Sequence, residues 1–545
     1  MTKTRINRLF ILLPSAVAVV SASYAVAPQA ALVSGTITGK STILRGANGA
    51  VNSFLGIPYA EKPQRFGLAV PPKPWKLPLN TSSFGSSCIQ YIIKTDTGPG
   101  QDILDELFNS HPPESEDCLS INAFAPANPA PPEGRPVVVY IPGGGFQLGN
   151  GLIDLSGFAA YEDIVAFTFN YRTNIFGFPN THDIPVSQRN LGLHDQRLAL
   201  DWVQANAKAF GGDPGRVTIW GESAGAMSTD LRLLAYADIH PPPFQGAILS
   251  SGQMSFGLLS TARSAHDERA WNAVSARVGC SGSKDRLTCM RNVPAATLLK
   301  GLEESNQTFM PVADHFTVPG GRAMRWRQGR VSKVPTLMTT VAEEGLSLVN
   351  RNISIERFLQ AYLPPPLATV RRQQRIVDYY RKKQGLVSDF DVAAAIYTDL
   401  VWQCPQQMLA NASASVTNPP VWRGYFNVSI AELLPSKFRF LGKCHGADVL
   451  LLFATPTLES LPVSAPLYAF ANYFRAVIGR FVRNPGGGPG WPAVGSSYAP
   501  FDVASLGDVG AEHTAGSTPV NRTTLDANCN LFRDILSAVP EVLHG

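Results

Sequence analysis

The sequence predicts an α/β fold, with a large and mostly parallel central sheet that is covered by helices on both faces. Near-continuous apolar runs at residues 136–141 and 164–169 are typical of strands that are buried on both sides. Residues 195–210 instead space their apolar side chains along one face of a helix. Strands that alternate with helices favour a parallel sheet, because a helix supplies the crossover between parallel strands. We expect residues 28–545 to form one elaborated domain.

The composition argues against several classes of protein. Hydrophobic residues make up 45% of the 545 residues and charged residues 16%, which is typical of a folded globular protein. The formal net charge is +5, and Lys3, Arg5 and Arg8 contribute three of these charges. Because the sequence has no dense run of lysine and arginine, we expect no nucleic-acid partner.

The first residues have the pattern of a secretory signal peptide. Basic residues precede an apolar stretch at residues 9–22, and small residues then offer Ala25 and Ala27 as cleavage points. We therefore expect residues 1–27 to be removed and the protein to be secreted. The apolar stretch is shorter than a comfortable membrane span, so we expect no stable membrane anchor.

Two further features fit export. The sequence has seven cysteines without paired Cys-x-x-Cys spacing, which favours a few disulfides over a zinc site. It also has six Asn-x-Ser/Thr sites, which would be glycosylation candidates in a eukaryotic host: Asn80, Asn306, Asn352, Asn411, Asn427 and Asn521.

A Gly-x-Ser-x-Gly motif at residues 221–225 is the most informative stretch of the chain. It directly follows the apolar run at residues 217–220 and precedes a helix-like segment. A strand that enters such a turn and leaves as a helix is the nucleophile elbow of the α/β-hydrolase fold. The motif therefore predicts a serine hydrolase, in which the turn pushes the hydroxyl of Ser223 out above the sheet and the helix N-terminus favours negative charge beside it.

A glycine-rich turn can supply the hydrogen-bond donors that such a serine needs. Residues 142–146 read Pro-Gly-Gly-Gly-Phe and directly follow the strand that ends at Ile141. Consecutive glycines let backbone N–H groups approach a substrate oxygen closely. This turn is the lipase and esterase form of the oxyanion loop.

The general base should be a histidine that follows Ser223, because the chain order in this fold is serine, acid, histidine. The available histidines are His240, His266, His315, His445, His513 and His544. We favour His445, because it lies in a glycine-flanked loop at residues 442–448.

The acid of the triad should lie between the serine and the histidine. Glu343 and Glu344 follow a strand-like run at residues 334–341, and the carboxyl ends of strands form the active-site edge of such a sheet. The residues themselves leave open which of the two glutamates is the acid.

Taken together, these motifs resemble the type B carboxylesterase and lipase family, which includes the cholinesterases. The resemblance covers almost all of the chain after the signal segment, and the protein looks like a secreted esterase of microbial or fungal type. The matching segments are residues 116–122, 170–172, 176–178, 190–196 and 210–225. Ser120 departs from the pattern, because threonine or tyrosine is usual at its position.

The resemblance implies a role for each matching residue. Ser223 would be the nucleophile, His445 the general base, and Glu344, directly before Gly345, the acid. The other roles fall on backbone donors of the oxyanion hole and on an acid that supports the imidazolium: Gly144, Gly145, Ala224 and Glu222.

The resemblance also implies the disulfides and leaves one thiol free. The implied pairs are Cys88 with Cys118, Cys280 with Cys289, and Cys404 with Cys529, and the remaining cysteine is Cys444.

The expected reaction is hydrolysis of a small-molecule carboxylic ester through an acyl-enzyme, with no metal or cofactor. A lid-like loop of the family corresponds to the 29 residues between Cys88 and Cys118. The loop is short and acidic, which favours short- to medium-chain esters, and it lacks the tryptophan with which cholinesterases bind choline. The alternatives are a lipase or sterol esterase acting at lipid surfaces, a hydrolase dedicated to one metabolite, and a catalytically inactive binding protein. The sequence does not indicate the oligomeric state.

Overall fold

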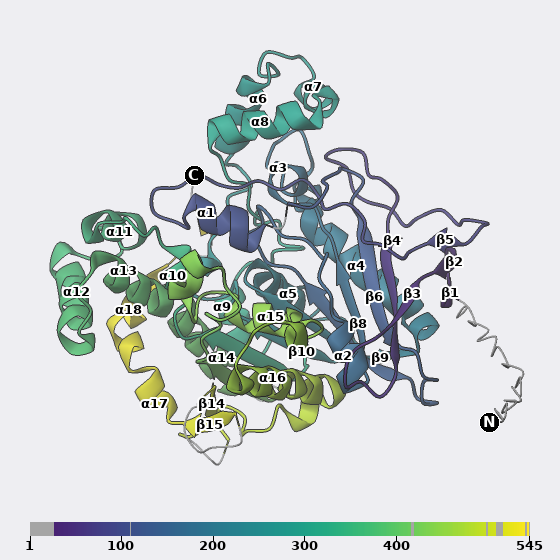
Figure 1. The fold of residues 1–545 in the computed structure, drawn as a ribbon. Coiled ribbons are helices and arrows are strands. Elements are labelled where there is room, and N and C mark those ends of the chain that lie inside the picture. The colour runs from purple at the N-terminus through teal and green to yellow at the C-terminus, as the bar shows by residue number, and fades with distance from the viewer. Residues whose placement is uncertain are drawn as a thin grey trace, which may run out of the picture.

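A central sheet of 11 strands organises the computed structural model (Figure 1). The structure describes residues 27–109, 111–415, 419–496, 500–507, 516–539 and 542–543. The predicted signal segment lies outside these residues except for its last position, and it stays a prediction. The strand order is β15, β14, β13, β12, β10, β9, β7, β8, β6, β4 and β3.

The middle of this sheet is parallel and both of its edges are antiparallel. The parallel strands, from one side to the other, are β8 (Val165–Phe169), β7 (Arg135–Ile141), β9 (Gly212–Glu222), β10 (Gly246–Ser250), β12 (Thr336–Val341), β13 (Val421–Phe426) and β14 (Val503–Leu506). The antiparallel strands are β15 (Ser517–Val520) on one edge and β6 (Ser120–Pro126), β4 (Ala50–Pro58) and β3 (Lys40–Ile43) on the other. The predicted α/β-hydrolase architecture is confirmed.

Two hydrophobic cores lie on the two faces of the sheet. Side chains alternate along β7, so that Val137 and Val139 belong to one core while Val138 and Tyr140 belong to the other. The first core packs on α4 (Leu191–Asn206), α5 (Ala224–Ala235) and α14 (Cys404–Ala414). The second packs on α2 (Ser156–Glu162), α15 (Ala447–Phe453) and α16 (Ala465–Arg483). Burial on both faces explains the unbroken apolar runs in the sequence.

The remaining helices form excursions between strands. The helices α6 (Arg269–Arg277), α7 (Arg286–Asn292) and α8 (Ala295–Ser305) gather at the top of the view in Figure 1. The helices α11 (Ile355–Tyr362), α12 (Val370–Gln384) and α13 (Asp389–Tyr397) gather at its left. Shorter helices are α1 (Gln101–Ile103), α3 (Asn174–Gly177), α9 (Arg322–Arg327), α10 (Gly345–Leu348), α17 (Arg522–Leu525) and α18 (Arg533–Ala538).

Two small sheets and several tight helical turns complete the fold. The small sheets comprise β1 (Gln29–Leu32), β2 (Gly35–Thr38) and β5 (Leu79–Asn80), and β11 (Ala262–Arg263) with β16 (Val542–Leu543). The helix that we expected at residues 195–210 begins earlier, at Leu191, and its last residues form a tighter turn, Ala207–Phe210. None of the described helices combines the length and the hydropathy that a membrane-spanning segment requires.

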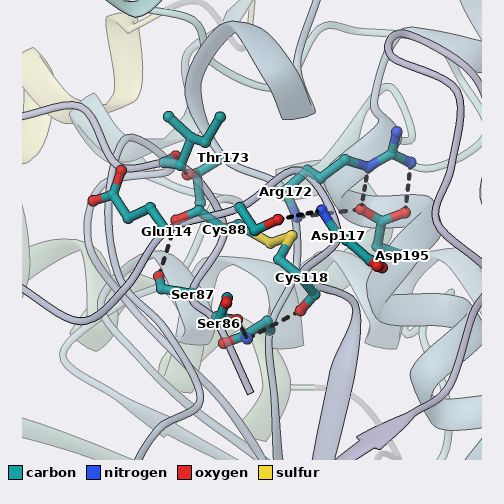
Figure 2. Close-up of a disulfide and its surroundings, with 12 residues drawn as sticks. Ser86, Ser87, Cys88, Glu114, Asp117, Cys118, Arg172, Thr173 and Asp195 are labelled. Atoms are coloured by element: carbon teal, nitrogen blue, oxygen red, sulfur yellow. Dashed lines mark hydrogen bonds and ion pairs between the residues drawn. A yellow bond between two sulfur atoms is a disulfide. The ribbon is translucent and has the colours of Figure 1, made fainter. Parts of the chain in front are cut away.

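The family-like segments of the sequence build a scaffold around the first disulfide (Figure 2). Cys88 is bonded to Cys118, and the Asn170 amide donates to the carbonyl oxygens of Ser86 at 2.9 Å and Cys118 at 3.0 Å. Close by, Arg172 and Asp195 form a buried ion pair at 2.7 Å. Burial of a charge is tolerated only when it is paired, so this pair locks the segment at 170–172 onto α4.

The other cysteines pair as the resemblance implied. Disulfides join Cys280 to Cys289 and Cys404 to Cys529, while Cys444 is free and buried. Burial raises the pKa of the Cys444 thiol to about 12. This thiol is therefore protonated at neutral pH and is not a nucleophile in the folded protein.

Candidate active site

Ser223 lies at the sharp turn between β9 and α5. Its φ of 54° is in the left-handed region that side chains other than glycine rarely adopt. A Cβ atom at Gly221 would lie 2.1 Å from the carbonyl carbon of Gly225, and one at Gly225 would lie 2.0 Å from the Ile141 oxygen. Only glycine fits at both positions, so the sequence motif is explained by the geometry of the elbow.

The glycine-rich turn packs directly against this elbow. A Cβ atom at Gly143 would lie 3.0 Å from Cβ of Ser223, and Gly144 and Gly145 have positive φ values of 107° and 60°. Neither Gly144 nor Gly145 donates its N–H to an acceptor within the described part of the chain. Ala224 is the first residue of α5, where a backbone N–H has no partner within the helix. The turn and the helix therefore offer free N–H donors beside Ser223.

His445 lies just before α15, and its imidazole is hydrogen-bonded to a glutamate side chain. The imidazole Nδ1 lies 2.6 Å from Oε2 of Glu344. Both side chains are buried, since His445 is 5% exposed and Glu344 is fully buried. A carboxylate on Nδ1 orients the ring and leaves Nε2 available to accept a proton.

The structure distinguishes between the two adjacent glutamates. Glu344 Oε1 accepts hydrogen bonds from Ser251 Oγ at 2.6 Å and from the Val341 N–H at 2.8 Å. Glu343, by contrast, is exposed on the surface. Glu344 therefore contacts the histidine, and it is the residue at which the family resemblance pointed.

Glu222 faces the other nitrogen of the imidazole. Its Oε1 lies 3.2 Å from His445 Nε2 and has no hydrogen-bond partner among the described residues. Burial raises the pKa of Glu222 to about 8, against the lowering effect of His445. Burial alone would lower the pKa of His445, but the charges of Glu222 and Glu344 outweigh it and raise that pKa to about 9.

Three side chains beside this group were not predicted from the sequence to have a role in the site. Ser251 has a φ of 46° and bonds Glu344, while Asp448 is fully buried and accepts from Thr339 Oγ1 at 3.4 Å. Burial, followed by repulsion from Glu344, raises the pKa of Asp448 to about 6. The third is Trp402, whose ring centroid lies 4.4 Å from that of His445. Asp448 stands in the histidine segment that we singled out, but no short motif marks Ser251 or Trp402.

The helical part of the lid-like loop packs next to the residue that follows the histidine. Within it, α1 continues into a π-helical turn, Leu104–Phe108, and Ile103 and Leu104 are both buried. Phe108 lies 3.7 Å from the position that a Cβ atom of Gly446 would occupy, next to the histidine. The turn is joined to the body of the protein by an ion pair of 2.5 Å between Glu106 and Lys437.

The candidate glycosylation sites differ in exposure. Exposed sites are Asn80, Asn306, Asn352 and Asn411, and half-buried sites are Asn427 and Asn521. The Asn427 amide oxygen accepts a hydrogen bond from Lys443 at 2.7 Å.

In the part of the chain that the structure describes, no three histidine, cysteine or acidic side chains are arranged to hold a metal ion.

The sheet, the elbow and the buried acid and histidine define an α/β-hydrolase. A model of the carboxylesterase family matches residues 26–501, and the chain belongs to that family. It is 32% identical to para-nitrobenzyl esterase of Bacillus subtilis (strain 168), over 69% of this chain and 75% of that protein. It is 29% identical to Lipase 1 of Geotrichum candidum, over 81% of this chain and 87% of that protein. It is 35% identical to carboxylesterase 5A of Felis catus, over 62% of this chain and 62% of that protein. The protein is a carboxylic ester hydrolase.

Proposed function

We propose that the protein is a secreted serine esterase that cleaves short- to medium-chain carboxylic esters through an acyl-enzyme on Ser223. The observation that carries the proposal is the chain of contacts from Ser251 through Glu344 to His445, whose Nε2 lies 3.2 Å from Glu222, the residue before Ser223 in the strained elbow. A base that is oriented by a buried acid is what nucleophilic catalysis by serine requires.

In the proposed reaction, His445 Nε2 takes the proton of Ser223 Oγ while Oγ attacks the ester carbonyl carbon. The negative charge that develops on the carbonyl oxygen is stabilised by backbone N–H donors, which we assign to Gly144, Gly145 and Ala224. His445 then protonates the departing alcohol, and the C–O bond of the ester breaks. Water attacks the acyl-enzyme by the same path and releases the carboxylic acid and Ser223.

Two carboxylates would stabilise the imidazolium that forms in each step. Glu344 holds one ring nitrogen through a hydrogen bond, and Glu222 lies 3.2 Å from the other. The same charges favour protonated His445 before substrate binds, so we expect the enzyme to be most active at alkaline pH.

The lid-like loop supports the preference for shorter acyl chains. Its apolar residues Ile103 and Leu104 are turned inward and buried, and Glu106 is held by an ion pair at the surface. A loop of this kind presents little apolar surface to a lipid interface. One observation favours the rival function of a lipase, since the match to Lipase 1 of Geotrichum candidum spans 81% of this chain.

Secretion is supported by the signal-like residues 1–27 and by three disulfides, which persist in oxidising compartments. We propose that the mature protein begins near residue 28. In a eukaryotic host, the exposed asparagine sites would then carry glycans.

A series of p-nitrophenyl esters from acetate to palmitate tests the chain-length proposal. We expect the maximum kcat/KM at butyrate to octanoate, without a rise in rate above the solubility limit of the ester. A maximum at palmitate, with activation at the interface, would establish the lipase instead. The matched variant Ser223→Ala should be inactive on every ester.

A further inference from the structure

The indole ring of Trp402 lies against the imidazole of His445. The two ring centroids are 4.4 Å apart and the ring planes are inclined by 37°. Both side chains are 5% exposed, so water is largely excluded from the contact. The indole Nε1 is buried without a hydrogen-bond partner among the described residues. Trp402 is therefore held by packing and not by a hydrogen bond of its indole.

Trp402 lies on a π-helical turn, Thr398–Gln403, which joins α13 to α14. Such turns are uncommon and are frequently found at functional sites. Thr398 Oγ1 accepts a hydrogen bond of 3.0 Å from the N–H of Gly345, the residue after Glu344. The same turn therefore contacts His445 through Trp402 and contacts Gly345, the residue next to the acid, through Thr398.

Contacts to distant segments fix this turn from several sides. Asp399 accepts hydrogen bonds from Tyr380 at 2.5 Å and from Asn528 at 2.9 Å. Gln403 accepts from Thr340 Oγ1 at 2.6 Å, and Cys404, the next residue, is bonded to Cys529. A side chain on a support of this kind has little freedom to move, which makes it suitable for holding a neighbour in position.

We propose that Trp402 is a positioning residue for the hydrolysis: it holds the His445 imidazole against Glu344 and stabilises the imidazolium through the face of its indole. The inference rests on the proposed function of this site. A cation over a tryptophan face is stabilised by the negative charge of the ring, most strongly when water is excluded.

The contact with the indole should raise the pKa of His445. The charged groups that act on the imidazole are Glu222, Glu344 and Asp448. The indole adds a neutral face that also favours the protonated ring, so loss of the indole should lower the pKa of His445. A residue that only filled space would act in the opposite direction, because water entering its cavity would relieve the desolvation that disfavours the imidazolium.

The first experiment measures kcat/KM for p-nitrophenyl butyrate against pH in the wild type, Trp402→Phe and Trp402→Leu. Phenylalanine keeps a ring face, and its introduction breaks no hydrogen bond of the indole. In Trp402→Phe we therefore expect only a small shift of the pH midpoint of kcat/KM. In Trp402→Leu the pH midpoint should fall by about 0.5 to 1 unit, with a lower plateau in kcat and a smaller change in KM. An unchanged or raised midpoint in Trp402→Leu would overturn the proposal.

Trp271→Leu is the matched control. Trp271 in α6 is also buried and also has an unpartnered indole N–H among the described residues, but it packs edge-to-face against Phe66 and not against the histidine. We expect it to lower stability while the pH midpoint of kcat/KM stays where it is in the wild type. A midpoint shift in the control equal to that in Trp402→Leu would contradict a specific role for Trp402.

A second readout does not depend on hydrolysis. A protonated imidazole in contact with an indole quenches its fluorescence, so the emission that Trp402→Phe removes should decrease as His445 becomes protonated. We expect this pH-dependent step in the wild type and its loss in both Trp402→Phe and His445→Gln. A wild type that shows the step but hydrolyses no ester would refute the proposed function alone. If the step persists in Trp402→Phe, the proposed contact is refuted.

Discussion

His445 Nε2 lies 3.2 Å from Oε1 of Glu222, while its Nδ1 lies 2.6 Å from Glu344, so one imidazole stands between two buried carboxylates. Both acids favour the protonated ring, and protonated histidine cannot act as the base. The arrangement therefore shifts activity to alkaline pH in exchange for stabilising the imidazolium that forms during the reaction.

Glu222→Gln should move the pH profile in a predictable direction. Because the charge of Glu222 raises the pKa of His445, its removal should lower the midpoint of kcat/KM by about one unit or more, and the plateau should fall about tenfold as imidazolium stabilisation is lost. The exposed neighbour of the acid supplies a control, since Glu343→Gln should leave the profile unchanged. A midpoint that rises in Glu222→Gln would contradict this account.

The same groups should make the protein less stable at alkaline pH. The pKa of Glu222 is raised from 4.5 to about 8, so the folded state binds more protons than the unfolded state between those values and stability falls as pH rises. The pKa of His445 is raised from 6.5 to about 9, so its contribution is complete below about 6.5 and is lost through about 9.

We therefore expect the Tm to fall between pH 6 and pH 9 by differential scanning calorimetry. Glu222→Gln should make the decline shallower, because glutamine does not titrate. A Tm that rises over this range in the wild type, or a decline of equal slope in both proteins, would count against the burial of these charges.

Ser251→Ala should weaken the orientation of the acid. The variant removes the 2.6 Å hydrogen bond to Glu344, and a bond to a charged group is worth about 1.5–3 kcal/mol. We expect kcat to fall about tenfold with little change in KM, together with a loss of unfolding free energy measured in urea.

A buried serine outside the site gives the comparison. The Ser255 hydroxyl also donates a buried hydrogen bond, of 2.7 Å, to a carboxylate, that of Asp230. Ser255→Ala should therefore lower the unfolding free energy by a similar amount, while kcat stays near the wild-type value. Equal losses of kcat in the two variants would show that Ser251 acts only through stability.

The three disulfides should contribute to stability in the order of the loops that they close. On chain-entropy grounds, the Cys404–Cys529 bond, which spans 125 residues, is worth about 5 kcal/mol, and the Cys280–Cys289 bond, which spans 9 residues, about 2.5 kcal/mol. Replacing each pair by serine and measuring unfolding free energy checks the ranking. A larger loss for the short loop would refute the entropic explanation.

The sequence was sufficient for the parts of the site that are built locally. The elbow at Ser223 and the turn at Gly144 carry glycines because the backbone geometry admits nothing larger, so the motif and the structure report the same constraint. The parallel strands were visible for a similar reason, since burial on both faces leaves an apolar run.

Other features depend on contacts between distant segments, which a single sequence does not display. Glu343 and Glu344 have the same chemistry, and only the fold buries one beside His445 and leaves the other in solvent. Trp402 lies 43 positions before the histidine on which it packs, and its π-helical turn is set by partners as distant as Cys529. The burial of Ile103 and Leu104 in the lid-like loop is likewise a tertiary effect.

The central claim is that Ser223 carries the acyl group, and mass spectrometry of a trapped intermediate tests it most directly. Wild-type enzyme that is mixed with p-nitrophenyl butyrate and quenched in acid should carry one butyryl group on the tryptic peptide of residues 217–232, with fragmentation assigning it to Ser223. Ser223→Ala should carry no label and show no turnover. Turnover by Ser223→Ala, or a label on another residue, would contradict the account.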